Sequence, residues 1–276
     1  RKDGSQDDSI LVIAMATLYL ALIGRHNNNT KLLRKYSDIT IKLLPLIHDH
    51  PDSNFIFMQL VELMTNIGDG NRAISLLHYA KQVIEESSND YEMLRFSITQ
   101  LNFRMVLGQI NYVKEIVEDL NDQSSLFGSK ETRFQINYLQ ALVQLFSGKY
   151  NHALSNFDKL IIFAENHNDS IQELLHSLLT IKTYIITGNI NRGSELLKRL
   201  SSLTAKHKNH YYSTLTLAIT AELEQKQNQY EQSLKTLEQF ITWYNNKIPI
   251  EVPTAIALTT ATETALLLWQ DLATKE

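Results

Sequence analysis

The sequence predicts an all-α fold, a right-handed superhelical solenoid of stacked antiparallel helix hairpins. Three observations lead to this prediction. A residue suited to a left-handed turn returns with a fixed period of forty positions, apolar residues return at fixed offsets from it, and the 276 residues include only nine Gly and four Pro. A fixed period of this kind is typical of repeat arrays, in which each unit buries its apolar face against its neighbours.

The period is defined by an anchor position and by columns at fixed offsets from it. The anchor residues tolerate the left-handed conformation that often follows a helix, and they are Gly68, Gly108, Gly148, Gly188 and Asn228. Five positions later the column is small or slim: Ala73, Val113, Ala153, Gly193 and Ser233. The columns nine and twelve positions later are apolar, and so is the column seven positions earlier: Val61, Leu101, Ala141, Ile181 and Ala221. No insertion interrupts this register between residues 54 and 253.

The columns indicate two helices in each unit. Offsets of five, nine and twelve lie on one face of a helix that follows the anchor, because successive steps of three and four residues share a face. The column seven positions before the anchor lies on the preceding helix and faces them. Small residues in both columns allow the two backbones to approach closely, so each unit is predicted to be a tight hairpin.

The stretch 148–160, GKYNHALSNFDKL, resembles the centre of a tetratricopeptide repeat (TPR), with Tyr150, Ala153 and Phe157 at motif positions. Tyr230 repeats the Tyr150 position, and Tyr184 matches the aromatic residue of the first helix. The usual unit has about 34 residues, whereas this one has forty, and the first-helix Trp and the closing Pro are missing. The resemblance therefore implies a divergent, long-period TPR-like array. The competing interpretation is an irregular helical bundle.

The helical pattern divides the chain into predicted helices, joined by short turns within units and by longer links such as 121–130 between them. The predicted helices span residues 9–24, 31–48, 53–67, 71–86, 91–107, 110–120, 131–147, 150–167, 170–187, 190–206, 210–227, 230–246 and 253–273. We interpret them as one solenoid domain over 1–276. It has an irregular first helix pair at 9–50, five regular units over 54–253 and an unpaired last helix at 253–273.

The last predicted helix keeps the register, since Ala261 lies one repeat period after Ala221, but its hairpin partner is missing. Apolar residues cover most of its sides: Ile256, Leu258, Leu266, Leu268, Trp269 and Leu272. Together with a first residue that is Arg and not Met, this suggests a fragment of a longer chain, or an end that another chain covers. We expect a contact at Trp269 and self-association through this helix.

Composition narrows the classes of function. The chain has no Cys, so it can form neither disulfides nor thiolate metal sites. Its net charge of −4, with interspersed signs, indicates no general attraction to nucleic acid or to anionic lipid. The apolar run 10–24 is shorter than the roughly 20 residues of a membrane span and is predicted to be a buried helix. We expect a cytoplasmic protein, or a nuclear one in a eukaryote, without nucleic-acid or membrane binding.

The sequence contains no motif that predicts catalysis. It lacks a glycine-rich phosphate loop, a nucleophile elbow and an HExxH motif. Two His-containing stretches have spacings that a metal could use, HDHPD at 48–52 and HKNH at 207–210, but the first lies at a helix end and the second in a basic link between units. We predict a protein that is not an enzyme and that holds no cofactor or metal.

The TPR resemblance implies that the first helices line a concave surface that binds a protein or peptide partner. Its predicted centre is apolar and consists of Tyr138, Leu142 and Leu145. Single polar or charged residues lie at its edges: Arg95, Asn102 and Lys182. The competing interpretation is that these residues pack together as ordinary core. The chaperone-tail clamp of the family is not expected, because its Lys position reads Met58, Ile98, Tyr138, Leu178 and Ala218.

Two functions are compatible with this pattern. The first is a non-enzymatic scaffold that wraps a segment of a partner chain in a larger assembly. The second is the effector- or peptide-sensing arm of a signalling or transcription regulator, since long-period arrays of this kind resemble the superhelical domains of MalT-like activators. The sequence leaves this choice open.

Overall fold

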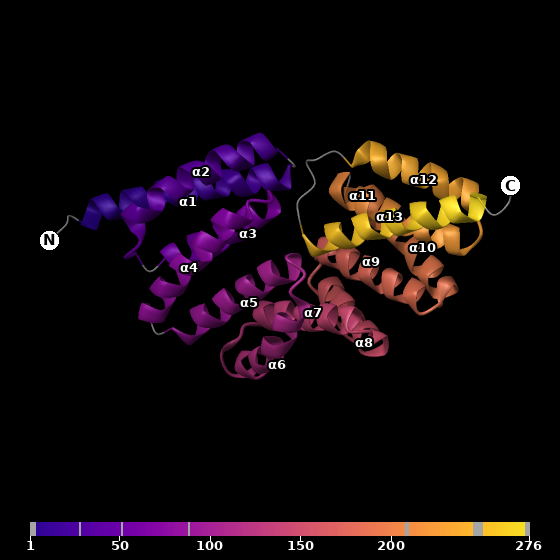
Figure 1. Ribbon diagram of the computed structural model, residues 1–276. Coiled ribbons are helices and arrows are strands. Elements are labelled where there is room, and N and C mark those ends of the chain that lie inside the picture. Colours follow the sequence, from indigo (N-terminus) through magenta and orange to yellow (C-terminus); the bar gives the residue numbers. More distant parts are fainter. Residues whose placement is uncertain are drawn as a thin grey trace. The chain divides into compact units, whose positions relative to one another are not determined.

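The computed structural model describes residues 4–27, 29–50, 52–87, 89–207, 210–244 and 251–273, and within these ranges the fold consists of α-helices with no strand (Figure 1). We call the odd-numbered helices first helices and the even-numbered ones second helices, according to their place in each hairpin. The helices are α1 (Gly4–His26), α2 (Thr30–Ile47), α3 (Ser53–Asn66), α4 (Gly70–Ser87), α5 (Asp90–Val106), α6 (Ile110–Phe127), α7 (Lys130–Phe146), α8 (Tyr150–Asn166), α9 (Ser170–Ile186), α10 (Ile190–His207), α11 (His210–Lys226), α12 (Tyr230–Trp243) and α13 (Val252–Ala273).

The contacts group these helices into two compact units. Unit 1 comprises residues 1–136 and 249–251, and unit 2 comprises residues 137–248 and 252–276, so the division falls inside α7. The sequence predicted one domain over 1–276, and that prediction rests on the repeat register, which continues through α7. Each unit has its own cluster of buried apolar residues.

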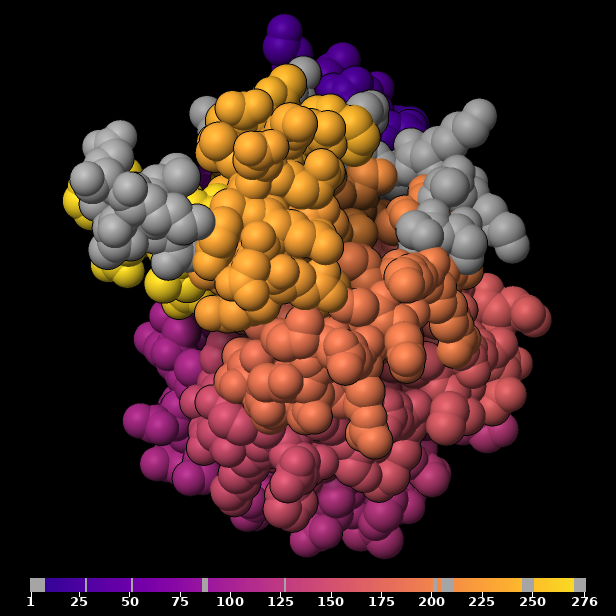
Figure 2. Space-filling view, turned by 90° about the vertical axis from the view of Figure 1, so that its right-hand side faces the viewer, coloured from indigo at the N-terminus to yellow at the C-terminus, as the bar shows by residue number. Residues whose placement is uncertain are grey.

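Within each unit, every hairpin packs on the next. In unit 1, α1 contacts α2 and α3, and α3 contacts α4 and α5. In unit 2, α9 contacts α10 and α11, while α13 packs on both α11 and α12. The second helices α10 and α12, coloured orange and gold, form the surface of unit 2 that faces the viewer in Figure 2. This pattern is the stacking of antiparallel hairpins that the repeat period predicts.

The five anchor residues form the same turn after α3, α5, α7, α9 and α11. Gly68, Gly108, Gly148, Gly188 and Asn228 have φ values of 78°, 72°, 73°, 74° and 62°, in the left-handed region. The residue that follows each anchor donates its N–H to a carbonyl five residues earlier, for example Lys149 N to Gln144 O at 2.8 Å. This is the helix-ending hydrogen bond of a Schellman motif. The predicted turns are confirmed.

The apolar columns are the interior of the hairpins. The column seven positions before the anchor is buried in every unit, from Val61 at 1% exposed to Ala221 at 0%. The small column on the second helices is equally buried, and Ser233 Oγ donates a 2.6 Å hydrogen bond to Ala221 O on the first helix of its own hairpin. A side chain this short is required because the two backbones lie so close.

Three details differ from the sequence prediction. Helix α6 continues to Phe127 instead of ending at residue 120, because Ser124 (2% exposed) extends the buried face of Leu120 by one turn. Helix α12 ends at Trp243, and residues 245–250 lie outside the described residues. On α13, Ile256 and Leu268 are buried, while Leu266 and Trp269 are exposed, so the apolar residues do not surround the helix evenly; the Leu272 side chain lies outside the described residues.

Replacing Ala153 with Leu tests the register. Ala153 is fully buried on α8, so a Leu side chain has no free space there, and we expect the free energy of unfolding to fall by about 1–3 kcal/mol. Urea denaturation measures this change. The matched control is Ser155→Leu, at an exposed position of the same helix, which should change stability by less than about 0.5 kcal/mol. Equal stability of the two variants would contradict the register.

Two helices pass the length and composition test for a membrane-crossing helix, at residues Asp8–His26 and Val252–Gln270. This test is weak evidence by itself, because core helices and signal sequences also pass it. Core helices, however, are mostly buried, and only 22% and 33% of these two stretches are buried. The first stretch was predicted to be a buried helix, and this prediction is wrong, since α1 packs on α2 and α3 with one side and exposes the other.

Candidate partner-binding site

The first helices of unit 1 enclose a cleft of about 320 Å³. Ligand-binding pockets typically begin near this size. Its lining residues come from α3, α5, α7 and the turn before α7: Met58, Gln59, Glu62, Tyr91, Arg95, Ile98, Thr99, Ser129, Glu131, Thr132 and Gln135. Many of them are paired one repeat period apart, as are Met58 and Ile98, or Arg95 and Gln135. The repeat therefore places the same columns of successive units around one cleft.

The cleft is lined mainly by polar side chains that lie over the apolar core. Met58 and Ile98 are each 2% exposed and form part of the packed interior. The hydroxyl groups of Thr99 and Thr132 are on nearly buried residues, whereas Gln135 lies exposed. Hydroxyl and amide groups both donate and accept hydrogen bonds. Such walls can satisfy the backbone of an extended peptide.

Arg95 is held in the cleft by two aromatic rings. Its guanidinium carbon lies 5.7 Å from the ring centroid of Phe55 and 5.9 Å from that of Tyr91, which are cation–π distances. Among the residues that the structure describes, no carboxylate forms an ion pair with it within 4 Å. The two ring contacts restrict the side chain, and its hydrogen-bond donors remain available to a ligand.

Glu62, on the wall of the cleft, belongs to a charged network with Arg25. Arg25 Nη1 lies 3.7 Å from Glu62 Oε2, and Arg25 Nη2 lies 2.5 Å from Glu251 Oε1. Burial raises the pKa of the Glu62 carboxyl, and Glu251 raises it further, while Arg25 and Arg95 lower it. Arg25 thus balances the negative charge of Glu62 on the wall of the cleft. Arg95 has no such ion-pair partner among the described residues.

The predicted partner-binding residues have different surroundings in the structure. Arg95 lines the cleft, and Asn102 is half-buried on α5. Tyr138 is half-buried in unit 2, with its ring centroid 5.2 Å from that of His176. Trp269 is 68% exposed on α13, so it is accessible for the predicted terminal contact, which stays a prediction.

The prediction that Leu142 and Leu145 form the centre of a binding surface is wrong. Leu142 is 0% exposed and Leu145 is 5% exposed, so both are core residues that a partner cannot reach. The repeat explains this burial. Met105 lies one repeat period before Leu145 and Ile185 one period after it, and both are also buried. Positions taken from the shorter family pattern here face neighbouring helices instead of solvent.

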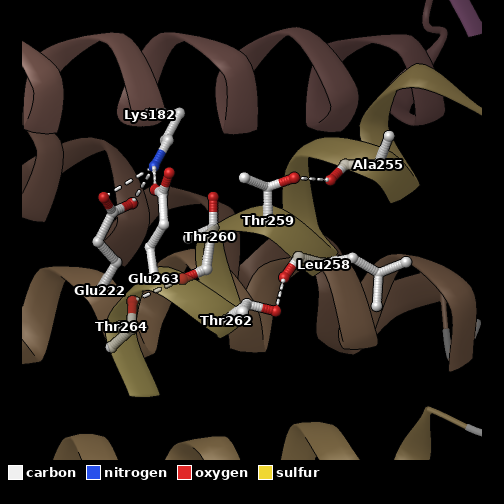
Figure 3. A network of polar contacts seen from close by, with 9 residues as sticks. All are labelled: Lys182, Glu222, Ala255, Leu258, Thr259, Thr260, Thr262, Glu263 and Thr264. Atoms are coloured by element: carbon white, nitrogen blue, oxygen red, sulfur yellow. Dashed lines mark hydrogen bonds and ion pairs between the residues drawn. The ribbon is translucent and has the colours of Figure 1, made fainter. Parts of the chain in front are cut away.

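Lys182 is not a free cation at the edge of a groove, and that prediction is also wrong. Its Nζ donates to both carboxylate oxygens of Glu222, at 2.8 and 2.9 Å, and lies 3.8 Å from Glu263 Oε2 (Figure 3). The Lys182 and Glu222 side chains are 11% and 10% exposed. Burial raises the pKa of Glu222, and the charge and hydrogen bonds of Lys182 oppose this shift. Lys182 on α9 therefore links to Glu222 on α11 and to Glu263 on α13 inside unit 2.

His176 is a buried histidine that the sequence pattern did not single out. It is 1% exposed, and burial lowers its pKa to about 3, so the ring is neutral at physiological pH. It occupies the column of Ile56, Phe96 and Ile136, which are all buried. The burial of this column indicates that His176 has a packing role, and its ring contacts that of Tyr138. Within the described part of the chain, no group of three or more His, Cys, Asp or Glu residues is placed to hold a metal ion.

Comparison with known proteins supports the fold. No protein-family model matches the chain, and no curated protein sequence matches it either. Among solved structures, the chain is similar to the nearly identical TPR-like repeats of a Podosopora anserina protein assigned as a kinesin light chain. The TM-score is 0.50 at 15% identity, over 70% of this chain and 95% of the other. The fold is TPR-like. At this level of identity the similarity concerns the fold alone.

Proposed function

We propose that this TPR-like chain is a non-enzymatic scaffold that binds an extended peptide segment of a partner protein in the unit 1 cleft. The observation that carries the proposal is Arg95, a cation that lies 5.7 and 5.9 Å from two aromatic ring centroids in a cleft with polar walls. A guanidinium group binds carboxylates through paired hydrogen bonds. We therefore expect the segment to carry an acidic side chain or a terminal carboxylate next to an apolar residue.

The rest of the cleft fits such a segment. The apolar residue would pack on the exposed ring of Tyr91, while hydroxyl and amide side chains of the walls would bind the peptide backbone. Tyr91 adds an aromatic ring that is 39% exposed at the same site. Aromatic and Arg side chains often contribute most of the binding free energy of an interface.

Selection of peptides from a displayed random library on the full chain, followed by calorimetric titration of the best binder, tests this proposal. Arg95→Ala should raise the Kd at least about 30-fold, as expected for an interface residue that contributes about 2 kcal/mol or more. Lys114→Ala, at an exposed position of second helix α6, is the control and should leave the Kd unchanged. Equal Kd values for wild type and Arg95→Ala, with an intact fold by circular dichroism, would contradict the proposal.

The sensing arm of a regulator is the second candidate function, and it uses the same cleft. This function predicts that a small effector binds the chain, that Arg95→Ala raises its Kd, and that no peptide binds. In that outcome the cleft is a ligand-binding site and the scaffold proposal is wrong.

A further inference from the structure

The unit 1 cleft carries opposite charges at two separate places. Arg95 supplies a positive charge from α5, and Glu62 supplies a negative charge from α3. Glu131 also lines the cleft, but it is exposed to solvent at the start of α7. An acidic peptide side chain bound to Arg95 leaves Glu62 without a ligand group. Glu62 is therefore the charged residue of the cleft whose role is still open.

Glu62 shares its cationic partner with a second carboxylate. Arg25 Nη2 lies 2.5 Å from Glu251 Oε1, whereas Arg25 Nη1 lies 3.7 Å from Glu62 Oε2, which is beyond hydrogen-bond distance. Glu62 accepts no hydrogen bond from any residue that the structure describes. One guanidinium and two carboxylates leave one excess negative charge at this wall. The Glu62 side chain is 35% exposed, so its acceptor positions are accessible to a ligand.

The repeat register gives the spacing of the two charges. Arg95 lies one period after Phe55, and its guanidinium carbon is 5.7 Å from the Phe55 ring, so these two residues stand side by side on α5 and α3. Glu62 follows Phe55 by seven residues on α3, which is about 10 Å along a helix axis. Three residues of an extended peptide span about the same distance, roughly 10 Å. One short extended segment can therefore reach both charges.

We propose that the cleft binds a segment in which a Lys or Arg side chain, placed about three residues from the acidic group on Arg95, binds Glu62. This inference rests on the proposed function and specifies its ligand. The basic side chain donates hydrogen bonds to the Glu62 carboxylate and compensates the excess negative charge. A second acidic side chain at this place would be repelled by Glu62 and Glu251. Between the two charges, Gln59 and Thr99 line the cleft one repeat period apart and face the segment.

Selection from a displayed random peptide library, on the wild-type chain and on Glu62→Gln, tests this inference. Peptides selected on wild type should combine an acidic residue with a basic residue about three positions away. Peptides selected on Glu62→Gln should keep the acidic residue and lose the basic one. The matched control is Glu115→Gln, at an exposed position of second helix α6, which removes the same charge outside the cleft and should select the same peptides as wild type.

Calorimetric titration of the best wild-type binder gives the size of the effect. Glu62→Gln should raise its Kd at least about 10-fold, because removing one partner of a partly buried charge pair leaves the other unpaired. Replacing the basic residue of the peptide with norleucine should raise the Kd by a similar factor on wild type. On Glu62→Gln the same replacement should change the Kd little, as expected when the two groups contact each other.

The inference is wrong if the selected peptides carry no basic residue at a fixed spacing from the acidic one, or if Glu131→Gln weakens binding while Glu62→Gln does not. The proposed function stands in both cases when Arg95→Ala still raises the Kd. Equal Kd values for wild type and Arg95→Ala would overturn the proposed function as well. If circular dichroism shows that Glu62→Gln does not fold, an unchanged Kd of the norleucine peptide on wild type contradicts the inference.

Discussion

Replacing Lys182 with Met is expected to lower the free energy of unfolding by about 3–5 kcal/mol, the usual cost of removing one partner of a buried ion pair. The variant leaves the Glu222 carboxylate buried without the ammonium group that holds it at 2.8 Å. Urea denaturation at pH 7 measures the change. A loss below about 1 kcal/mol, as for a solvent-exposed pair, would contradict the buried arrangement.

The double variant Lys182→Met and Glu222→Leu is the control for this effect. It removes both charges, so it should lose less stability than Lys182→Met alone, because apolar replacements of a buried pair are often close to neutral. The pH dependence has a definite sign. The folded-state pKa of Glu222 is raised by burial, so folding favours its protonated form. The deficit of Lys182→Met should therefore shrink as the pH falls through that pKa.

Replacing Gly24 with Ala is expected to destabilise the chain by about 1–3 kcal/mol, as is usual for an overpacked contact. Helix propensity alone predicts the opposite, because Ala in a helix is better than Gly by roughly 0.5–1 kcal/mol. The added Cβ would lie 2.6 Å from Leu33 N and 3.0 Å from Leu33 Cα, which are backbone atoms of α2. One of the two helices has to move.

Gly70→Ala is the matched control, since an added Cβ there has nothing within 4 Å. This variant should be neutral or slightly stabilising in the same thermal or urea denaturation. If Gly24→Ala is as stable as Gly70→Ala, the close approach of α1 and α2 is wrong.

The sequence predicted the hairpins well because each turn repeats a local signal. A left-handed anchor such as Gly148 and a small residue such as Ala153 act within one hairpin, so their roles can be read from the chain without knowledge of distant contacts. The end of α6 was missed for the opposite reason. Residues 121–127 have a polar sequence with loop character, and only the burial of Ser124 shows that the helix continues.

The candidate site was harder to predict because exposure depends on how neighbouring units pack. Leu142 was placed on the surface by analogy with a shorter repeat, whereas contacts with neighbouring helices bury it. The Lys182 pair could have been found, since Lys182 and Glu222 have opposite charges in one column of adjacent units. Arg95 was identified, and its contacts with Phe55, one repeat period earlier, and with Tyr91, four residues earlier on the same helix, could have been found in the same way.

The most direct test of peptide binding by the first helices is site-specific photo-crosslinking. A photoreactive phenylalanine analogue is placed at Gln135, exposed in the cleft, or at Lys114, exposed on a second helix, and the full chain is irradiated with its best-binding peptide. Mass spectrometry then identifies the linked chains. We predict that the peptide is linked from position 135 and not from position 114. A link from position 114, with none from position 135, would contradict the proposal and place binding on the second helices.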